Sequence, residues 1–405
     1  MMLAASLMLS PAARAQDAGT TPVDGARTDS RLHLGPLYAT PRLELKQFGI
    51  DNNVFNQADD AKSDFTVDVA PGLNVALPVA HRALVQMTGT ADLVYFAHYS
   101  SERSVDPFLK TRAESYLQRV MVYGEASVNS SRQRPNFEID VRSRRTDTDA
   151  RAGAQLRVTP KFSVDVAGYR DTTAYDAGAF AEGADFHTTL NHSSSGVVVT
   201  PRYELTPYTT ITTRVDLFRN DFPFDGNRGS DNVKILPGVE FNPRALVAGR
   251  AAVGYRRLTP ASPTLLPAFA GLVADVGLSY RLLSATKLDV TFNRDLQYSL
   301  ELLQPYFVDN SVGASVRREL GGNFDISVHG ERHLYRYQNY LPAVPGAAGL
   351  ADRADQTLVY SGSLGYRIRR DVRFGVTLTS ANRESPLPGR SFKGVRVGTD
   401  LHYGF

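Results

Sequence analysis

The chain has 405 residues, a formal net charge of +3, and neither Cys nor Trp. The lack of Cys excludes thiol catalysis and Cys-ligated metal sites, and it suits a protein that is exported unfolded through an oxidising compartment. The nearly balanced charge lacks the basic footprint of a nucleic-acid-binding protein. No segment reaches the roughly 18 to 20 consecutive apolar residues that a transmembrane helix requires.

The N-terminal residues have the pattern of an export signal. A short apolar run, Met2–Leu9, is followed by the small-residue site Ala13-Arg14-Ala15. We therefore expect residues 1–15 to be a signal peptide that is removed before Gln16. Residues 16–40 are rich in Gly, Asp, Thr and Pro and are predicted to form a flexible segment, which leaves 41–405 as one folded domain.

From about residue 41 onward, apolar and polar side chains alternate in one segment after another. This period of two predicts strands with one apolar and one polar face, and no helical spacing of three and four is sustained. In one of these strands the alternation is lost at Phe218, where we expect the clear register to end. The clearest alternating segments are 64–69, 162–166, 211–217, 288–293, 324–329 and 372–379.

Short and long connections between these segments also alternate. Tight breaks are expected at 79–81, near Arg119, and at 159–161, 206–208, 242–244, 283–285, 321–323 and 369–371. Longer polar loops are expected at Asp51–Lys62, Ser100–Pro107, Ser131–Glu138, Asp176–Asp185, Asp221–Ser230, Thr259–Pro267, Leu300–Pro305, Asn339–Ala351 and Arg383–Arg390.

This alternation is typical of an outer-membrane barrel with short periplasmic turns and long extracellular loops. The fold class we predict is therefore all-β, a transmembrane antiparallel up-and-down β-barrel of about 18 strands. Its first strand is Arg42–Ile50 and its last Phe392–Phe405. The first strand and the stretch Gln118–Val122 are the weakest, so 16 strands is the alternative. An even number places both termini, and the segment 16–40, on the periplasmic side. A propeller would need four short strands in each repeat of about 40 residues, whereas this chain has two long ones.

The last strand carries a second membrane signal. Its apolar face ends on a carboxy-terminal aromatic residue, which is unusual because chain ends are normally polar and frayed. The ending resembles the C-terminal signal that the barrel assembly machinery of Gram-negative bacteria recognises. We therefore expect that machinery and outer-membrane lipid as partners. The residues of this expected assembly signal are Val397, Leu401, Tyr403 and Phe405.

If the apolar face meets lipid, charged side chains must face inward, because exposing them to hydrocarbon costs several kcal/mol. A barrel of this size holds an aqueous channel, and its mixed charges favour polar solutes or flexible sugars over strong ion selectivity. Alternatively, these charges only brace the inner wall. Asn339–Ala351 or another long loop is a candidate to fold inward as a constriction. The lumen-lining candidates are Asp68, Asp92, Arg151, Arg157, Asp165, Arg214, Asp216, Asp289, Asp325, Arg373, Arg396 and Asp400.

One group of residues could form a catalytic pair and another could bind a metal, but both groups have a simpler interpretation. His192 and Ser194 resemble the His-x-Ser arrangement of an outer-membrane phospholipase, but the tract is Ser-rich and no oxyanion donor or orienting partner can be identified. His329, Glu331 and His333 share a strand face and could hold a metal, although a polar lumen stripe is the favoured interpretation. We therefore expect no enzyme activity, no catalytic residue, no metal and no cofactor.

Several short motifs resemble one known family. Phe48–Phe55 contains a Gly, an Asp/Asn group and Asn-Val-Phe, and it is followed by Ser63–Phe65 and by Val69–Leu73 with its Pro-Gly pair. Arg142–Gly153 and Leu156–Lys161 fit the middle section of the same family. The pattern resembles the putative β-barrel porin type 2 family, which includes EpsL-like outer-membrane proteins of exopolysaccharide operons. This resemblance implies an outer-membrane barrel and brings no catalytic residues.

The leading hypothesis is thus a porin-like passage in the outer membrane that serves exopolysaccharide export or surface assembly. Exopolysaccharide and its export apparatus are then expected partners, and nucleic acid is not. One alternative is an occluded scaffold barrel whose loops bind polysaccharide or partner proteins. A second is a lipid-modifying enzyme centred on His192 and Ser194.

Overall fold

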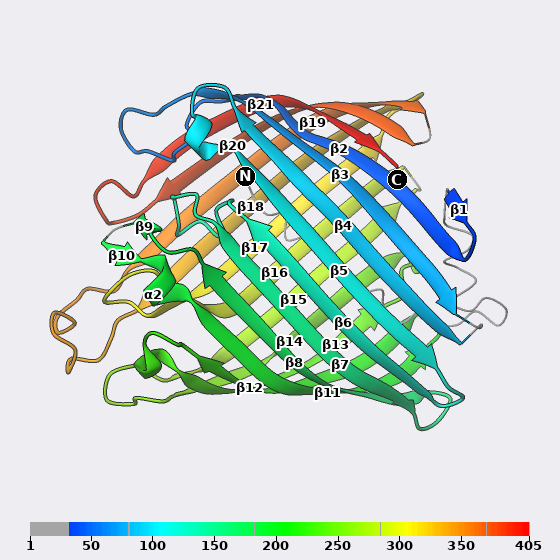
Figure 1. Cartoon of the computed structure of the whole chain (residues 1–405), viewed down its shortest axis with the longest axis horizontal. Coiled ribbons are helices and arrows are strands. Elements are labelled where there is room, and N and C mark those ends of the chain that lie inside the picture. Colours follow the sequence, from blue (N-terminus) through cyan, green and yellow to red (C-terminus); the bar gives the residue numbers. More distant parts are fainter. Residues whose placement is uncertain (1–31, 80–81, 182, 284, 370, 405) are drawn as a thin grey trace.

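The computed structural model describes residues 32–79, 82–181, 183–283, 285–369 and 371–404. Eighteen long strands pair with their sequence neighbours in antiparallel fashion, and the last strand, β21, pairs with the first long strand, β2. The sheet is therefore a closed barrel of tilted strands (Figure 1). The prediction of 18 antiparallel strands is confirmed, and the alternative of 16 is not.

The elements follow in chain order. The strands are β1 Leu32–Leu34, β2 Leu37–Asp51, β3 Asp64–Val79, β4 Ala83–Phe96, β5 Ser104–Tyr116, β6 Val120–Ser131, β7 Arg145–Arg157, β8 Phe162–Tyr175, β9 Phe180–Ala181, β10 Ala184–Asp185, β11 His192–Thr206, β12 Thr209–Asp221, β13 Ser230–Phe241, β14 Val247–Pro260, β15 Phe269–Leu282, β16 Thr286–Tyr298, β17 Tyr306–Glu319, β18 Phe324–Gln338, β19 Ala354–Arg369, β20 Val372–Glu384 and β21 Phe392–Tyr403. Two 3-10 turns, Ser100–Glu102 and Gly226–Arg228, and a short helix, α2 Phe186–Leu190, lie in the loops.

The outer face of the barrel is largely apolar because exposed hydrophobic side chains recur at every second position along most of the strands. Ile50 is 58 % exposed and Val328 is also 58 % exposed, and comparable aliphatic side chains recur on nearly every strand. Polar and charged side chains occupy the alternate positions, as the sequence pattern predicted. Closure gives the strands no free edge, so the backbone groups of the ladders are paired around the whole ring.

The seam between β2 and β21 depends on close backbone contact. A Cβ atom on Gly49 would lie 2.0 Å from the carbonyl oxygen of Val397, so only glycine fits there. The β2 register also shifts between Leu45 and Gln47, which marks a β-bulge beside the seam. Ring closure is therefore encoded locally, by a glycine and a bulge in the first long strand.

Long loops gather at one end of the barrel, at the left of Figure 1, and short turns gather at the other. Three of the predicted boundaries differ clearly from the structure. The predicted loop Ser100–Pro107 is shorter because β5 begins at Ser104, whereas the predicted loop Ser131–Glu138 runs on to residue 144. β12 does not lose its register at Phe218 but continues to Asp221, with the ring of Phe218 against the inward-facing Arg256.

The N-terminal boundary also differs from the prediction. β2 begins at Leu37 rather than after residue 40, and β1 lies in the segment that was expected to be flexible. The predicted signal peptide, residues 1–15, and Phe405 of the predicted assembly signal lie outside the described residues. Among the described helices, none is long and apolar enough to cross a membrane.

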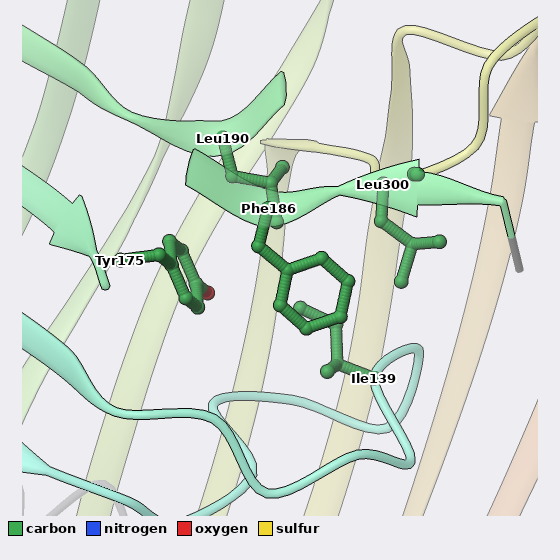
Figure 2. Close-up of a cluster of buried hydrophobic side chains, with 6 residues drawn as sticks. Ile139, Tyr175, Phe186, Leu190 and Leu300 are labelled. Atoms are coloured by element: carbon green, nitrogen blue, oxygen red, sulfur yellow. The ribbon is translucent and has the colours of Figure 1, made fainter. Parts of the chain in front are cut away.

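The described residues form no single central core: most hydrophobic clusters lie under the long loops, and one, formed by Tyr123, Ala167 and Val198, lies on the inner wall of the barrel. Asp185 caps the N-terminus of the helix α2: its side chain accepts a hydrogen bond from the backbone NH of His187. The helix buries Phe186 and Leu190, which lie one turn apart. Figure 2 shows Phe186 between Tyr175, Leu190 and Leu300, with Ile139 reaching the same ring from a separate loop. This loop is the one that joins β6 to β7.

Candidate functional site

The loop between β6 and β7, residues 132–144, crosses the interior of the barrel, and we call it the crossing loop. It starts from β6 and ends in β7, yet its middle contacts β18, which lies nine strands from β7 in either direction around the ring. The backbone NH of Phe137 donates to the hydroxyl of Tyr335 at 3.3 Å, and its ring lies 4.7 Å from that of His333. The loop thus reaches from one wall of the lumen to the opposite wall.

Aromatic side chains and an arginine hold the centre of the crossing loop in place. Phe137 packs against buried Phe307, Tyr335 and Tyr337 on β17 and β18. From β20, the fully buried guanidinium of Arg383 donates to the carbonyl oxygen of Phe137 at 2.6 Å and pairs with the Asp140 carboxylate at 2.5 Å. Apolar packing and a buried ion pair therefore fix the same short stretch.

Glu138 is the most deeply buried acid of the crossing loop, with 1 % of its surface exposed. Its carboxylate accepts from the Ser299 hydroxyl at 2.5 Å and from the Leu300 backbone NH at 3.2 Å. Arg390 donates to the Glu138 carbonyl oxygen at 2.9 Å. Burial in this site, helped by the nearby charge of Glu301, raises the pKa of Glu138 to about 7.

Neighbouring long loops complete the closure. Arg353 pairs with Asp355 at 2.6 Å and with Glu301 at 2.8 Å, and Glu301 also pairs with Arg390 at 3.3 Å. These contacts join the β16–β17, β18–β19 and β20–β21 loops. The predicted candidate Asn339–Ala351 packs on adjacent loops, with Leu341 donating to the carbonyl oxygen of Leu265 at 2.9 Å. The inward fold that was expected of one long loop is thus found in the crossing loop.

At the short-turn end, away from the crossing loop, the barrel contains a cavity of about 1480 Å³. Its lining reaches the short-turn end, because it includes the turn residues Gln118, Arg119 and Lys161. Neutral polar side chains such as Gln155 and Thr200 lie between charged ones. Such a lining can hydrate polar solutes and exchange hydrogen bonds with sugar hydroxyls.

All twelve predicted lumen residues lie at strand positions opposite to the exposed apolar side chains. Nearly all of them are paired with other side chains. Arg373 joins β18 to β21 by bridging Asp325 and Asp400, each at 2.7 Å. Asp68 is buried, but neither of its oxygens has a hydrogen-bond partner among the described residues. The remaining ion pairs are Arg151–Asp165, Arg214–Asp216, Lys46–Asp92, Lys287–Asp289 and Arg396–Asp51, while Arg157 has no ion-pair partner in the described part of the chain.

The two candidate chemical groups are engaged in structural contacts. The Ser194 hydroxyl donates a hydrogen bond to the side-chain oxygen of Asn220, and the His192 ring contacts the carbonyl oxygen of Leu190 at 2.7 Å. His192 and Ser194 are therefore bound to other residues and not to each other. His333 contacts Glu331 at 2.8 Å, and His329 lies 3.5 Å from the same carboxylate. Within the described ranges, no group of His, Asp or Glu side chains has the arrangement of a metal site.

The sequence reasoning missed the residues that close the barrel, namely Phe137, Glu138 and Asp140 of the loop and their arginine partners Arg383 and Arg390. One feature of the sequence could have indicated that this loop folds inward. Phe137 and Ile139 are apolar residues in an otherwise polar loop, and both would be exposed to water if the loop pointed away from the barrel. The arginine partners lie 243 or more residues away in sequence, so no local pattern identifies them.

The chain was also compared with known proteins. No curated protein matches the sequence. Among solved structures, it resembles the outer membrane protein OpdK of Pseudomonas aeruginosa (TM-score 0.46, 10 % identity, covering 90 % of this chain and 98 % of that one). It also resembles a BenF-like porin of Pseudomonas fluorescens Pf-5 (TM-score 0.48, 10 % identity, covering 91 % and 99 %). The model of the family described as Putative beta-barrel porin 2 matches residues 32–404, and the chain belongs to that family of porin-like outer-membrane β-barrels.

Proposed function

We propose that this barrel is a gated passage for hydrophilic solutes across the outer membrane. The observation that carries the proposal is the cavity of about 1480 Å³, lined by charged and neutral polar side chains among apolar ones, which reaches the short-turn end inside a closed ring of strands. In the conformation described here, the crossing loop closes the other end.

The solute we propose is an exopolysaccharide on its way to export or surface assembly. Two features support this assignment. The motifs at Phe48–Phe55 and Arg142–Gly153 resemble a family that includes proteins of exopolysaccharide operons. The cavity lining mixes hydroxyl, amide and charged side chains, which suits a flexible sugar chain. The export apparatus that delivers the polymer would then be a partner of the short-turn end.

The proposed orientation places the short turns and both termini in the periplasm. Short periplasmic turns and long extracellular loops are the rule in such barrels. The crossing loop would then close the extracellular mouth. The C-terminal strand, with Val397, Leu401 and Tyr403 on its outer face, would be the segment that the assembly machinery recognises.

A second candidate function is an occluded scaffold whose loops bind polysaccharide or partner proteins. The ion pairs that fix the crossing loop favour it, because Arg383 and Arg390 are both almost fully buried and hold Asp140 from two sides. The two functions differ in one respect: a passage must be able to release this loop.

Liposome swelling with sugars of increasing size distinguishes the two candidates. We expect liposomes that contain the folded protein to take up small sugars at pH 8, with uptake falling as the sugar grows. If neither the natural protein nor a variant lacking residues 133–143 admits any sugar, the barrel is a scaffold. In the source organism, deletion of the gene should reduce surface exopolysaccharide, and normal exopolysaccharide in the deletion strain would rule out the proposed solute.

A further inference from the structure

The cavity at the short-turn end has an excess of positive charge. Its lining contains twelve Arg or Lys and seven Asp or Glu side chains, an excess of five. Six of the seven acids form ion pairs with bases of the same lining, such as Asp165 with Arg151 and Glu240 with Arg202. Ion pairs within the lining therefore neutralise most of its acidic side chains and leave several basic side chains without an acidic partner.

Four lining bases have no ion-pair partner among the described residues: Arg42, Arg119, Arg157 and Lys161. Glu204 is the one lining acid that is likewise without an ion pair in the described chain. All four bases are exposed, so their charges face water inside or at the mouth of the cavity.

Three of these bases form one cluster at the rim. Arg119 lies in the β5–β6 turn, Arg157 ends β7, and Lys161 lies in the β7–β8 turn. The Arg157 backbone NH donates to the carbonyl oxygen of Arg119 at 2.8 Å, which ties the first two turns together. Arg82 lies in the turn before them and is also exposed, and its carbonyl oxygen accepts from the Tyr116 backbone NH at 2.7 Å. We call Arg82, Arg119, Arg157 and Lys161 the basic rim.

We infer that the basic rim and the cavity behind it bind a polyanionic oligosaccharide, a sugar chain that carries carboxylate, sulfate or phosphate groups. This inference narrows the solute class of the passage proposed above and rests on that function for its biological meaning. The chain would meet the basic rim first, and Arg42 together with the polar lining would then receive its inner end.

The presence of several unpaired bases favours a chain that carries repeated charges over a small anion. An exposed ion pair in water is worth only about 0 to 1 kcal/mol, so a single carboxylate or phosphate would bind weakly at any one of these sites. A repeating anion can engage several bases at once, and each further pairing is then intramolecular. Neutral side chains between the bases, including Gln118, Gln155 and Ser163, offer hydrogen bonds to sugar hydroxyls. This combination of charges and amides favours a saccharide over an acidic peptide.

Fluorescence anisotropy of labelled dextran sulfate tests the inference with the folded full-length protein in detergent micelles. The test variant is the triple substitution Arg119→Gln, Arg157→Gln and Lys161→Gln. The matched control, Arg170→Gln, Arg257→Gln and Arg336→Gln, removes the same charge from exposed arginines on β8, β14 and β18, outside the cavity lining. Neutral dextran and poly-glutamate of similar length serve as competitors.

We expect dextran sulfate to bind at least about tenfold more tightly than neutral dextran. The test variant should bind dextran sulfate about tenfold more weakly than the natural protein, because it removes three weak ion pairs at once. The control variant should bind like the natural protein. Equal reductions in the two variants, or tighter binding of poly-glutamate, would overturn the inference. Because binding in micelles needs no open channel, polyanion binding without sugar uptake would refute the passage and leave the binding site intact.

Discussion

We expect closure of the barrel to depend on pH through the buried carboxyl of Glu138. Its pKa is about 7 in the closed structure, against an ordinary value of 4.5 for a loop that has been released into water. The closed state therefore binds the proton more tightly. Closure is favoured as the pH falls below about 7, and it weakens as the pH rises and the buried carboxylate ionises.

The size of the effect follows from the two pKa values. Between pH 5.5 and pH 8, the closed state should lose about 2 kcal/mol relative to the released state, or roughly a 25-fold change in their ratio. Single-channel recording should show this as a higher open probability at pH 8 than at pH 5.5. The charged groups near Glu138 include Glu301, Arg390 and the buried Arg228. The contributions of Glu301 and Arg390 are already contained in the raised pKa of Glu138.

Glu138→Gln provides the decisive variant because an amide fills the same space and cannot ionise. Its open probability should change little across this pH range. Ser299 and Leu300 would still have a hydrogen-bonding partner, so the loop should remain seated. A second titratable ring, His333, lies against Phe137. If the variant keeps the full pH dependence, the assignment to Glu138 is wrong.

Three further outcomes can be checked by substitution. Arg383→Met removes the closest cation of the Asp140 carboxylate and leaves it only the more distant Arg390, which should weaken closure by about 1 to 3 kcal/mol and raise the open probability in planar bilayers. Gly49→Ala should prevent ring closure, because the added Cβ would lie 2.0 Å from the carbonyl oxygen of Val397, and the heat-modifiable band on a gel should be lost. The control Gly124→Ala should keep that band, because a Cβ at Gly124 meets nothing within 4 Å. Arg373→Gln removes the bridge between two carboxylates of β18 and β21 and should lower stability by about 2 kcal/mol, measured as a lower urea midpoint of refolded protein; an unchanged midpoint would show that the bridge adds nothing.

Most of the barrel could be predicted from sequence because its constraint is local. Lipid on one side and water on the other impose a period of two on every strand, and the eight tight turns interrupt that period at regular distances. The same logic explains the error at Phe218. A large aromatic side chain can face inward when it packs against a cation such as Arg256, so an apolar residue at a polar position does not end a strand.

The closing of the lumen could not be predicted in the same way. The crossing loop has the polar composition of an outward loop, and its fate depends on partners on the opposite wall. Phe137 meets Tyr335, and Asp140 meets Arg383, across hundreds of residues of sequence. Likewise, the sequence alone predicted mixed charges in the lumen. It could not identify the unpaired basic residues, because that requires the ion pairs of the structure.

We expect the crossing loop to close a barrel that otherwise conducts. Single-channel conductance of the natural protein and of a variant with residues 133–143 replaced by a short Gly-Ser linker tests it most directly, after both have been shown to fold by heat-modifiable migration. We expect rare or small openings for the natural protein and a large, persistent conductance for the variant. Equal conductance in the two, or none in either, would contradict it.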